Sequence, residues 1–528
     1  MFRAAALCFF LAACSTPLPS SLPGPVSDRL ASDPPTPTSA AALPPRPHAT
    51  PGPTRGVISP GQPLPYVVQS GDTVIAIAAH FNTTPAEVLA ANPALPMTAT
   101  LAPGQTITVP AYYFPLGGPT FQIIPDGEFV YGPAVKDFDL TAYLNSRPGL
   151  LRRLSAYVAG KQRSSADTLR YVAEQYSINP KLFIALMEWR SRVLTQAVPP
   201  DVAKHPLGAA AGDNPYGLAD GPRGFYLQSL WVAEQLSLGY YGWRTGALTT
   251  LRFGDASRRF ATPSGYRSRV DMYQNAGTVA VHNLLAQMLP YEEFEAAAGP
   301  AGFAATYYAL WGNPFREAPP GGTESETSRS TPWGPPVIPG DLTQPELALP
   351  FASNQQWSLT GGPHPGWGSN LPWSALDIAP PAGETGCIAT EKWVTAAAPG
   401  VVVRTNDNTL ILDLDGDGYE QTGWVLFHFH MAAHDLLPAG TRVRPGDLLG
   451  HPSCEGGAAT GTHVHLARRY NGEWLPAEGI VDGVLPFVIG GWTAQKGEAP
   501  YQGRLVRLGA WVEACTCSTA ANRVYWVK

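Results

Sequence analysis

The sequence is poor in charged residues, which narrows the range of possible partners. Only 14% of its 528 residues are Asp, Glu, Lys or Arg, against about 25% in a typical soluble protein. The net charge is −6 and no run of Lys or Arg is present, which argues against nucleic acid as a partner. Outside the N-terminus, no apolar run reaches the roughly 18 residues that a membrane-spanning helix needs.

Proline and glycine are abundant, with 55 and 54 residues, while the hydrophobic share is an ordinary 44%. At about one domain per 150 residues, the length predicts three or four packed units. Much of the proline lies in two stretches that lack apolar periodicity, 14–63 and 316–345. Such segments cannot offset the ordering entropy of a core. We expect the first to be an extended tether and the second a linker.

The N-terminus has the pattern of an export signal. Arg3 precedes the apolar stretch Ala4–Ala13, which is too short to span a bilayer and suits a secretory signal. Leu11-Ala12-Ala13-Cys14 resembles a bacterial lipobox, which implies a signal peptide over 1–13 and a lipidated Cys14. We therefore expect an exported chain, anchored by lipid to the cell envelope on the side that faces the wall. An ordinary cleaved signal is the alternative.

Six cysteines are present, of which Cys8 is lost with the signal and Cys14 is lipidated. The remaining four allow three pairings in an oxidising compartment. We favour Cys387 with Cys454, because both lie inside one proposed domain. Cys515 and Cys517 then form a tight bridge or stay free.

Residues 64–111 predict a small module of strand, helix, helix and strand. Asp72 can cap the first helix, and Thr84-Pro85-Ala86-Glu87 has the pattern of a capping box. The segments YVVQSGDT, LAANP and LAPGQTITVP resemble a LysM domain. The resemblance implies binding of N-acetylglucosamine-containing glycan between the loop at Gly71, Asp72 and Thr73 and the loop after Asn92. A module with no ligand is the alternative.

Residues 115–315 predict a mainly helical unit. Its segment INPKLFIALMEWRS weakly resembles the lysozyme-like transglycosylases, which have a catalytic Glu before a Ser. Here Arg190 precedes Ser191, and arginine cannot protonate a leaving oxygen. We therefore expect a non-catalytic helical unit. A displaced acid at Glu188, which would make the chain bifunctional, is the alternative.

Seven of the 11 histidines fall between His364 and His465, which indicates a metal site in the last unit. His463 and His465 are two residues apart in a strand-like run, and so are His428 and His430. The two side chains of each pair are therefore expected to face the same side of the strand. Asp377 lies in an apolar, strand-like run, where an unpaired carboxylate is costly.

The segments GGPHPGWGSNLPWSALDIAPP, WVLFHFHM and CEGGAATGTHVHLARR resemble the lysostaphin-type zinc metallopeptidases, and most closely their beta-lytic/staphylolysin branch. The resemblance spans 346–495 and leaves 496–528 as a C-terminal extension. It implies one Zn²⁺ held by His364, Asp377 and His465, an arrangement that leaves a position open for water. It also implies that His430 and His463 are catalytic, without saying which is the base. Phe429 stands where the family often has Tyr, so any hydroxyl that assists catalysis must come from another residue. His428, His434 and His451 lie outside the motif and are expected to be structural.

Asp413, Asp415 and Asp417 resemble the start of a calcium loop. The twelfth position is Trp424 rather than Glu, and the flanking runs suggest a hairpin. Ca²⁺ here is the less favoured interpretation.

The expected fold class is multidomain α+β: a βααβ LysM module, a mainly α middle domain and an antiparallel all-β metallopeptidase domain. The expected function is that of a lipid-anchored endopeptidase that hydrolyses stem or cross-bridge peptides of peptidoglycan, with LysM bound to the glycan. The alternative is a catalytically inactive wall-binding lipoprotein that recruits or activates another hydrolase. The cleaved bond is not predicted.

Overall fold

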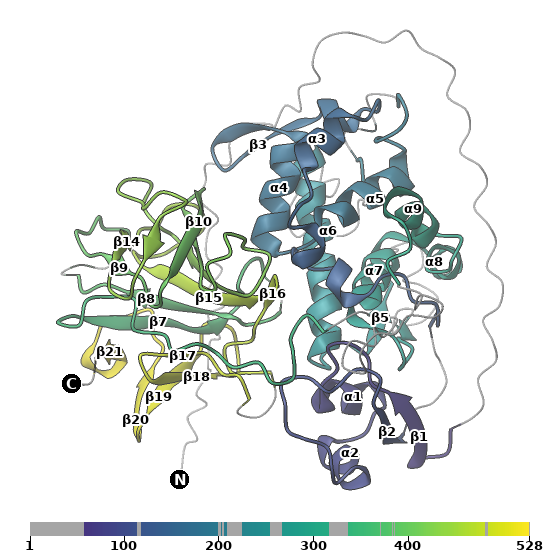
Figure 1. The fold of residues 1–528 in the computed structure, drawn as a ribbon, viewed down its shortest axis with the longest axis horizontal. Helices are drawn as coiled ribbons and strands as arrows, with labels where there is room; N and C mark the ends of the chain where they lie inside the picture. The colour runs from purple at the N-terminus through teal and green to yellow at the C-terminus, as the bar shows by residue number, and fades with distance from the viewer. Residues whose placement is uncertain are drawn as a thin grey trace, which may run out of the picture.

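A computed structural model describes residues 58–112, 118–198, 202, 205–207, 224–253, 267–315, 336–369, 371–382, 384, 386–480 and 484–526. The signal peptide, Cys14 and most of the expected tether lie outside these residues, as does the linker up to residue 335. Figure 1 shows three parts: a β-rich C-terminal unit, a helical middle unit, and a small N-terminal module against one end of the helices.

The N-terminal module has the expected order of elements. Its strands pair antiparallel, and Thr84 and Glu87 form the reciprocal capping box that the sequence predicts. The first helix is capped by Thr73, whose hydroxyl accepts the Ala76 amide, rather than by Asp72. The elements are β1 (Gln62–Val67), α1 (Val74–His80), α2 (Pro85–Ala91) and β2 (Thr106–Ala111).

The middle unit is helical with short hairpins. Its long central helix α6 packs along α7, and both are buried on most sides. The helices are α3 (Leu140–Asn145), α4 (Ser165–Tyr176), α5 (Pro180–Ser191), α6 (Gly224–Arg244), α7 (Ala276–Met288), α8 (Tyr291–Ala297) and α9 (Phe303–Trp311). The strands are β3 (Ser155–Val158), β4 (Lys161–Ser164), β5 (Thr250–Arg252) and β6 (Arg267–Arg269).

The C-terminal unit is built on an antiparallel sheet in the order β13-β10-β11-β12-β15-β8-β7-β21, with β16 paired to β15. The two-residue period of its strands gives it two apolar faces. Leu376, Leu426 and Leu466 face a core within the unit. The strands are β7 (Gln356–His364), β8 (Ala375–Ala379), β10 (Gly400–Asn406), β11 (Thr409–Asp413), β12 (Trp424–Phe429), β13 (Arg442–Val443), β15 (Val464–Tyr470), β16 (Glu473–Trp474) and β21 (Arg523–Tyr525).

Two smaller sheets complete this unit. Strands β9 (Val394–Thr395) and β14 (Leu448–Gly450) form one, and β17 (Val488–Ile489), β18 (Trp492–Lys496), β19 (Gly503–Arg507) and β20 (Ala510–Glu513) form the other. Residues after 495, expected as an extension, thus supply β19, β20 and β21, and β21 pairs with β7 of the main sheet. The final segment is part of the β unit.

The other face of the main sheet packs against the middle unit. Ala375, Phe427 and Trp474 belong to the same buried cluster as the helices α4 and α6, and in Figure 1 these helices lie beside β15 and β16. Buried ion pairs accompany this contact: Arg244 of α6 bonds Glu473 at 2.7 Å, and Arg469 bonds Glu420 at 2.8 Å. The units pack against each other instead of hanging separately on linkers.

The described end of the expected linker, 336–345, is packed as well. Thr100 donates to the Ile338 carbonyl at 2.7 Å, and Gln344 donates to the Val488 carbonyl at 2.6 Å. This stretch therefore connects the N-terminal module to the β unit. Among the described residues, no single helix is long and apolar enough to cross a bilayer, although α1 and α2 pass that test as a bent pair.

Candidate metal centre

The main sheet brings together the five residues expected at the site. Asp377 Oδ1 lies 3.2 Å from His364 Nε2, 3.3 Å from His465 Nδ1 and 3.5 Å from His463 Nε2. Asp377 and His465 are cross-strand partners in β8 and β15, and His364 ends β7. The His430 ring lies 4.6 Å from that of His463. His364, Asp377, His430 and His465 are buried, and the side chain of His463 is 12% exposed.

His430 reaches the site because the strand ends before it. β12 stops at Phe429, and His430 has a left-handed φ of +60°, which is uncommon for residues other than glycine. The expectation that His428 and His430 face one side is therefore wrong. His428 pairs with Leu410 and Leu466, on the core side of the sheet, and is fully buried there. It has the structural role that the sequence suggested.

Backbone carbonyls fix the tautomers of the site histidines. Nδ1 of His364, His430 and His463 donates to the carbonyls of Gly362, Glu455 and Gly461 at 2.7, 2.8 and 2.7 Å. His465 is reversed, because its Nε2 donates to the Gly366 carbonyl at 3.0 Å. Each of these imidazoles therefore turns an unprotonated nitrogen toward the centre. Such partners orient metal-binding histidines in general.

This arrangement fits a cation. His364 Nε2 and His465 Nδ1 lie 3.0 Å apart, yet with both other nitrogens donating to carbonyls, neither has a proton to share. Asp377 Oδ1 is buried and has no hydrogen-bond partner. Two facing lone pairs beside a buried carboxylate repel one another unless a positive charge lies among them. The chemistry of the three donors, two imidazoles and one carboxylate, is that of a catalytic metal site with a free position.

Local charge and burial set the ionisation of these groups. Burial alone would raise the pKa of Asp377, whereas a positive charge held among His364, His465 and His463 lowers it well below its usual range. Burial lowers the pKa of His430 to about 3, and His463 adds to the effect. Asp377 is thus a carboxylate and His430 a neutral imidazole at neutral pH.

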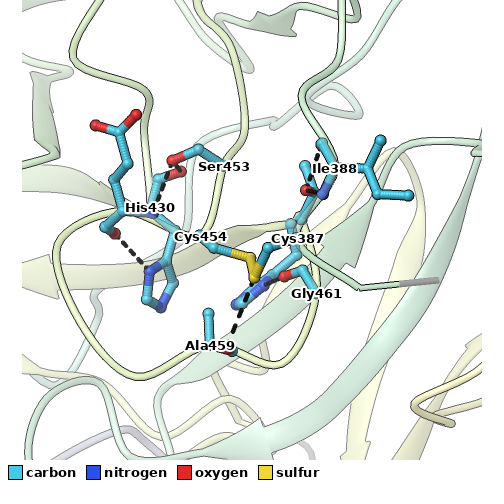
Figure 2. Close-up of a disulfide and its surroundings, with 10 residues drawn as sticks. Cys387, Ile388, His430, Ser453, Cys454, Ala459 and Gly461 are labelled. Atoms are coloured by element: carbon cyan, nitrogen blue, oxygen red, sulfur yellow. Dashed lines mark hydrogen bonds between the residues drawn. A yellow bond between two sulfur atoms is a disulfide. The ribbon is translucent and has the colours of Figure 1, made fainter. Parts of the chain in front are cut away.

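A disulfide borders the site. Cys387 and Cys454, the pair favoured from the sequence, are bonded with their Cα atoms 5.7 Å apart. Figure 2 shows the bond beside His430, joining the loop at Ile388 to the loop that runs from Ser453 to Gly461. Ser453 donates its amide to the His430 carbonyl at 2.7 Å. The bridge therefore holds the loops that orient His430 and His463. Cys515 and Cys517, left open above, are also bonded.

Two aromatic residues at the site were missed by the sequence analysis. The Tyr501 ring stacks on His364 at 4.1 Å, and its amide donates to the Pro363 carbonyl. Tyr501 brings a phenol next to a proposed metal ligand, in a chain that has Phe429 in place of the family's tyrosine. Trp367 packs on Phe429 at 4.7 Å. In the sequence, only the turn residues around Tyr501 mark its position, and that signal is not specific.

The loop expected to bind glycan lies between two units. Asp72 and Thr73 are 9% and 3% exposed, and Arg244 of α6 donates to the Gly71 carbonyl. Burial raises the pKa of Asp72 to about 7, and its carboxylate accepts from the Tyr66 hydroxyl at 2.7 Å. The loop is thus covered by the middle unit, so a glycan cannot reach it in this arrangement.

Asn92 has partners of its own inside the module. Its side-chain amide donates to the Val88 and Thr108 carbonyls at 2.8 and 2.6 Å, and its oxygen accepts from the Thr108 amide at 2.9 Å. These bonds hold the end of α2 against β2. They give Asn92 a structural role that the sequence resemblance did not show.

Glu188, the displaced acid of the alternative interpretation, has a local structural role. Its carboxylate accepts from the Leu194 amide at 2.9 Å and from the Thr195 hydroxyl at 2.5 Å, and the residue is 4% exposed. It thereby fixes the turn after α5. That the middle unit is not catalytic stays a prediction.

The acidic cluster in the hairpin is also bonded locally. Asp413 accepts from the backbone amides of Asp415, Gly416 and Gly418. Carboxylate oxygens of Asp413, Asp415 and Asp417 lie within 4.8 Å of one another. Calcium there remains the less favoured interpretation.

With its sheet-borne cluster of histidines around an aspartate, the chain is a metallopeptidase that is similar to the lysostaphin type, and it carries a LysM domain. The LysM family model matches residues 66–110. A second model, described as the N-terminal domain of LasA, matches residues 122–321.

The particular relatives are proteases. Protease LasA of Pseudomonas aeruginosa is 27% identical over 377 residues, covering 69% of this chain and 78% of LasA. Beta-lytic metalloendopeptidase of Achromobacter lyticus is 27% identical over 172 residues, covering 31% of this chain and 42% of that protein. Among solved structures, the deep-sea metalloprotease pseudoalterin matches with 26% identity and a TM-score of 0.27, covering 33% of this chain and 96% of that one.

Proposed function

We propose that the chain is an exported, lipid-anchored endopeptidase that cuts the peptides of peptidoglycan with the help of zinc. The observation that carries the proposal is the convergence of His364, Asp377 and His465 on one point, with two further histidines beside them. The LysM domain supports peptidoglycan as the substrate, and so do relatives that are named as a protease and a beta-lytic metalloendopeptidase.

The proposed roles follow from the free nitrogens described above. A zinc ion at His364, Asp377 and His465 would supply a Lewis acid and lower the pKa of a water molecule. His430 and His463 each offer an unprotonated Nε2, because Nδ1 is engaged with a carbonyl. One accepts the proton of the attacking water, and the protonated imidazole can then donate to the tetrahedral oxyanion or the leaving amine. We propose that Tyr501, whose ring stacks on His364, supplies the hydroxyl that Phe429 lacks.

Digestion of purified peptidoglycan tests the proposal. The full chain, loaded with zinc, should release new amino termini, and a chelator should stop the release. Mass analysis of the fragments identifies the bond. If the zinc-loaded chain releases none while it still binds peptidoglycan, the alternative of an inactive wall-binding protein replaces this proposal.

Anchoring rests on the lipobox-like LAAC sequence around Cys14. Two or more acyl chains bind membranes firmly, since each buried CH₂ adds about 0.8 kcal/mol. We expect the wild-type chain in the membrane fraction and Cys14→Ser in the soluble fraction. A wild-type chain that is soluble after export would refute the anchor without affecting the peptidase.

Glycan binding through LysM should require separation from the middle unit. Arg269 donates to the Ala79 and His80 carbonyls at 3.1 and 3.2 Å, holding α1 against β6. Arg269→Ala should therefore loosen the contact and raise the affinity of the full chain for N-acetylglucosamine oligomers, measured by calorimetry. Arg267→Ala, at an exposed position of the same strand, is the matched control. Equal affinity in all three proteins would show that packing does not limit the binding.

A further inference from the structure

A second group of metal-binding side chains lies outside the site described above. One nitrogen each of His434 and His451 and one oxygen of Asp435 lie within 4.8 Å of one another. His434 Nδ1 is 3.2 Å and His451 Nε2 is 3.9 Å from Asp435 Oδ2. The side chains of His434 and Asp435 are 64% and 65% exposed, whereas that of His451 is 5% exposed. From the sequence, both histidines are expected to be structural.

His451 is prepared as a ligand in the same way as the histidines of the first site. Its Nδ1 donates to the Lys392 carbonyl at 2.9 Å, so its Nε2 holds an unprotonated lone pair on the side of Asp435. The Trp393 ring packs against it at 4.0 Å. A hydrogen bond from one ring nitrogen to a carbonyl, together with a fixed ring plane, is typical of metal-binding histidines.

The backbone brings the three residues together independently of their side chains. The Ala432 amide donates to the His451 carbonyl at 2.8 Å, and the Leu437 amide donates to the Leu449 carbonyl at 2.9 Å. These bonds hold the turn 432–437 on the end of β14. Asp435 has a left-handed φ of +54° within that turn. The juxtaposition is therefore part of the fold rather than a chance contact of long exposed side chains.

We propose that His434, Asp435 and His451 bind a second divalent transition-metal ion, with zinc the probe of choice. Two imidazoles and one carboxylate suit zinc and its neighbours in the transition series, whereas Ca²⁺ and Mg²⁺ prefer oxygen. Because two ligands are exposed, their ordering costs entropy, so this ion should bind more weakly than the first.

The second ion would act on the segment that carries His430. Met431 bridges to Pro452, and the Ser453 amide donates to the His430 carbonyl at 2.7 Å. An ion between His434 and His451 would join the same two chain segments on the other side of Met431. We therefore expect its binding to stabilise the turn after β12, with no ligand shared with the first site.

Metal content of the full chain tests the proposal. Each protein is equilibrated with excess zinc near neutral pH, passed over a desalting column and analysed for zinc by mass spectrometry, and the weaker ion is titrated by calorimetry. Wild type should bind two ions, and His434→Ala and Asp435→Asn one each. His465→Ala should lose the tight ion and keep the weak one, and His465→Ala with His434→Ala should bind none. Glu513→Gln, an exposed acid of the same unit, is the control that keeps two.

A second measurement, the thermal midpoint of unfolding, does not depend on peptidase activity. In His465→Ala, zinc should still raise the thermal midpoint, and in the double variant it should not. Wild type that binds one ion overturns the proposal, as do His434→Ala and Asp435→Asn proteins that bind as many ions as wild type. Because both residues are exposed, these variants should fold, and their midpoints without zinc check this.

Discussion

His465→Ala should abolish peptidase activity and remove the tightly bound metal, whereas His463→Ala should lose activity and keep the metal. His463 directly precedes β15 and His465 lies within it, yet their free nitrogens differ in role: His465 Nδ1 faces His364 Nε2 at 3.0 Å, while His463 lies beside His430. Loss of a ligand removes the Lewis acid. Loss of a general acid or base typically costs about 10²–10⁴-fold in rate.

The measurements are zinc content and the rate at which amino termini are released from peptidoglycan. Glu513→Gln should match wild type in both. If His463→Ala loses zinc as readily as His465→Ala, the division into ligand and catalyst is wrong. If both keep zinc and full rate, the site lies elsewhere.

Glu420→Gln should destabilise the protein strongly without touching the catalytic residues. Glu420 accepts from Arg404 at 2.8 and 2.9 Å and from Arg469 at 2.8 Å, and it is 6% exposed. The substitution removes the negative charge between the two buried guanidinium groups. Breaking a buried ion pair in this way lowers the free energy of unfolding by about 3–5 kcal/mol. At about 2–4 °C per kcal/mol, the thermal midpoint should fall by roughly 6–20 °C.

The exposed pair Lys496–Glu478 provides the control. Its atoms are 2.9 Å apart and the Lys496 side chain is 55% exposed, so Lys496→Ala should change stability by less than about 1 kcal/mol. If both variants lower the thermal midpoint equally, the buried ion pairs of Glu420 stabilise the protein no more than an exposed pair does.

The effect of Glu420→Gln should also depend on pH. Burial raises the pKa of Glu420, but the lowering by Arg404 and Arg469 is larger. The pKa of Glu420 in the folded protein therefore lies below its usual 4.5. A lowered native pKa means that the unfolded chain binds more protons as the pH falls. The stabilising contribution is therefore complete above about pH 4.5 and is lost as the pH falls through the native pKa. The difference between wild type and variant should shrink in acid.

The proposed metal ligands follow from the resemblance to a known family, and the short-range geometry of strands agrees with that choice. The two-residue period places His463, just before β15, and His465, within it, on one side of the strand, and the long segment between His364 and Asp377 matches a family pattern. The same rule failed at His430, because the strand ends one residue earlier and the left-handed backbone at that position is set by packing. Tyr501 was missed for a related reason: its contact with His364 depends on how a distant loop crosses the end of β7.

Contacts between units were beyond the sequence analysis. Hydrophobic periodicity predicted that the helices and strands have buried faces, but it does not say which unit covers which face. The loop at Gly71 has the sequence of a glycan-binding loop, and only Arg244, in a helix far along the chain, shows that it is covered. Likewise the charges of Arg469 and Glu473 gave no sign of being buried, since charged residues usually lie on the surface.

The shared face of the main sheet has a practical consequence for dissecting this protein. Asp377 and His465 lie on the same face of the sheet as Ala375 and Ala467, whose side chains pack in the same cluster as the helices. A fragment cut at residue 346 to isolate the peptidase would therefore expose Phe427 and Trp474 beside its own metal site, together with arginines that have lost partners. We expect such a fragment to self-associate through this face, which would conceal the metal site being assayed. Activity measurements on the separated unit would then report the solubility of the fragment rather than its chemistry.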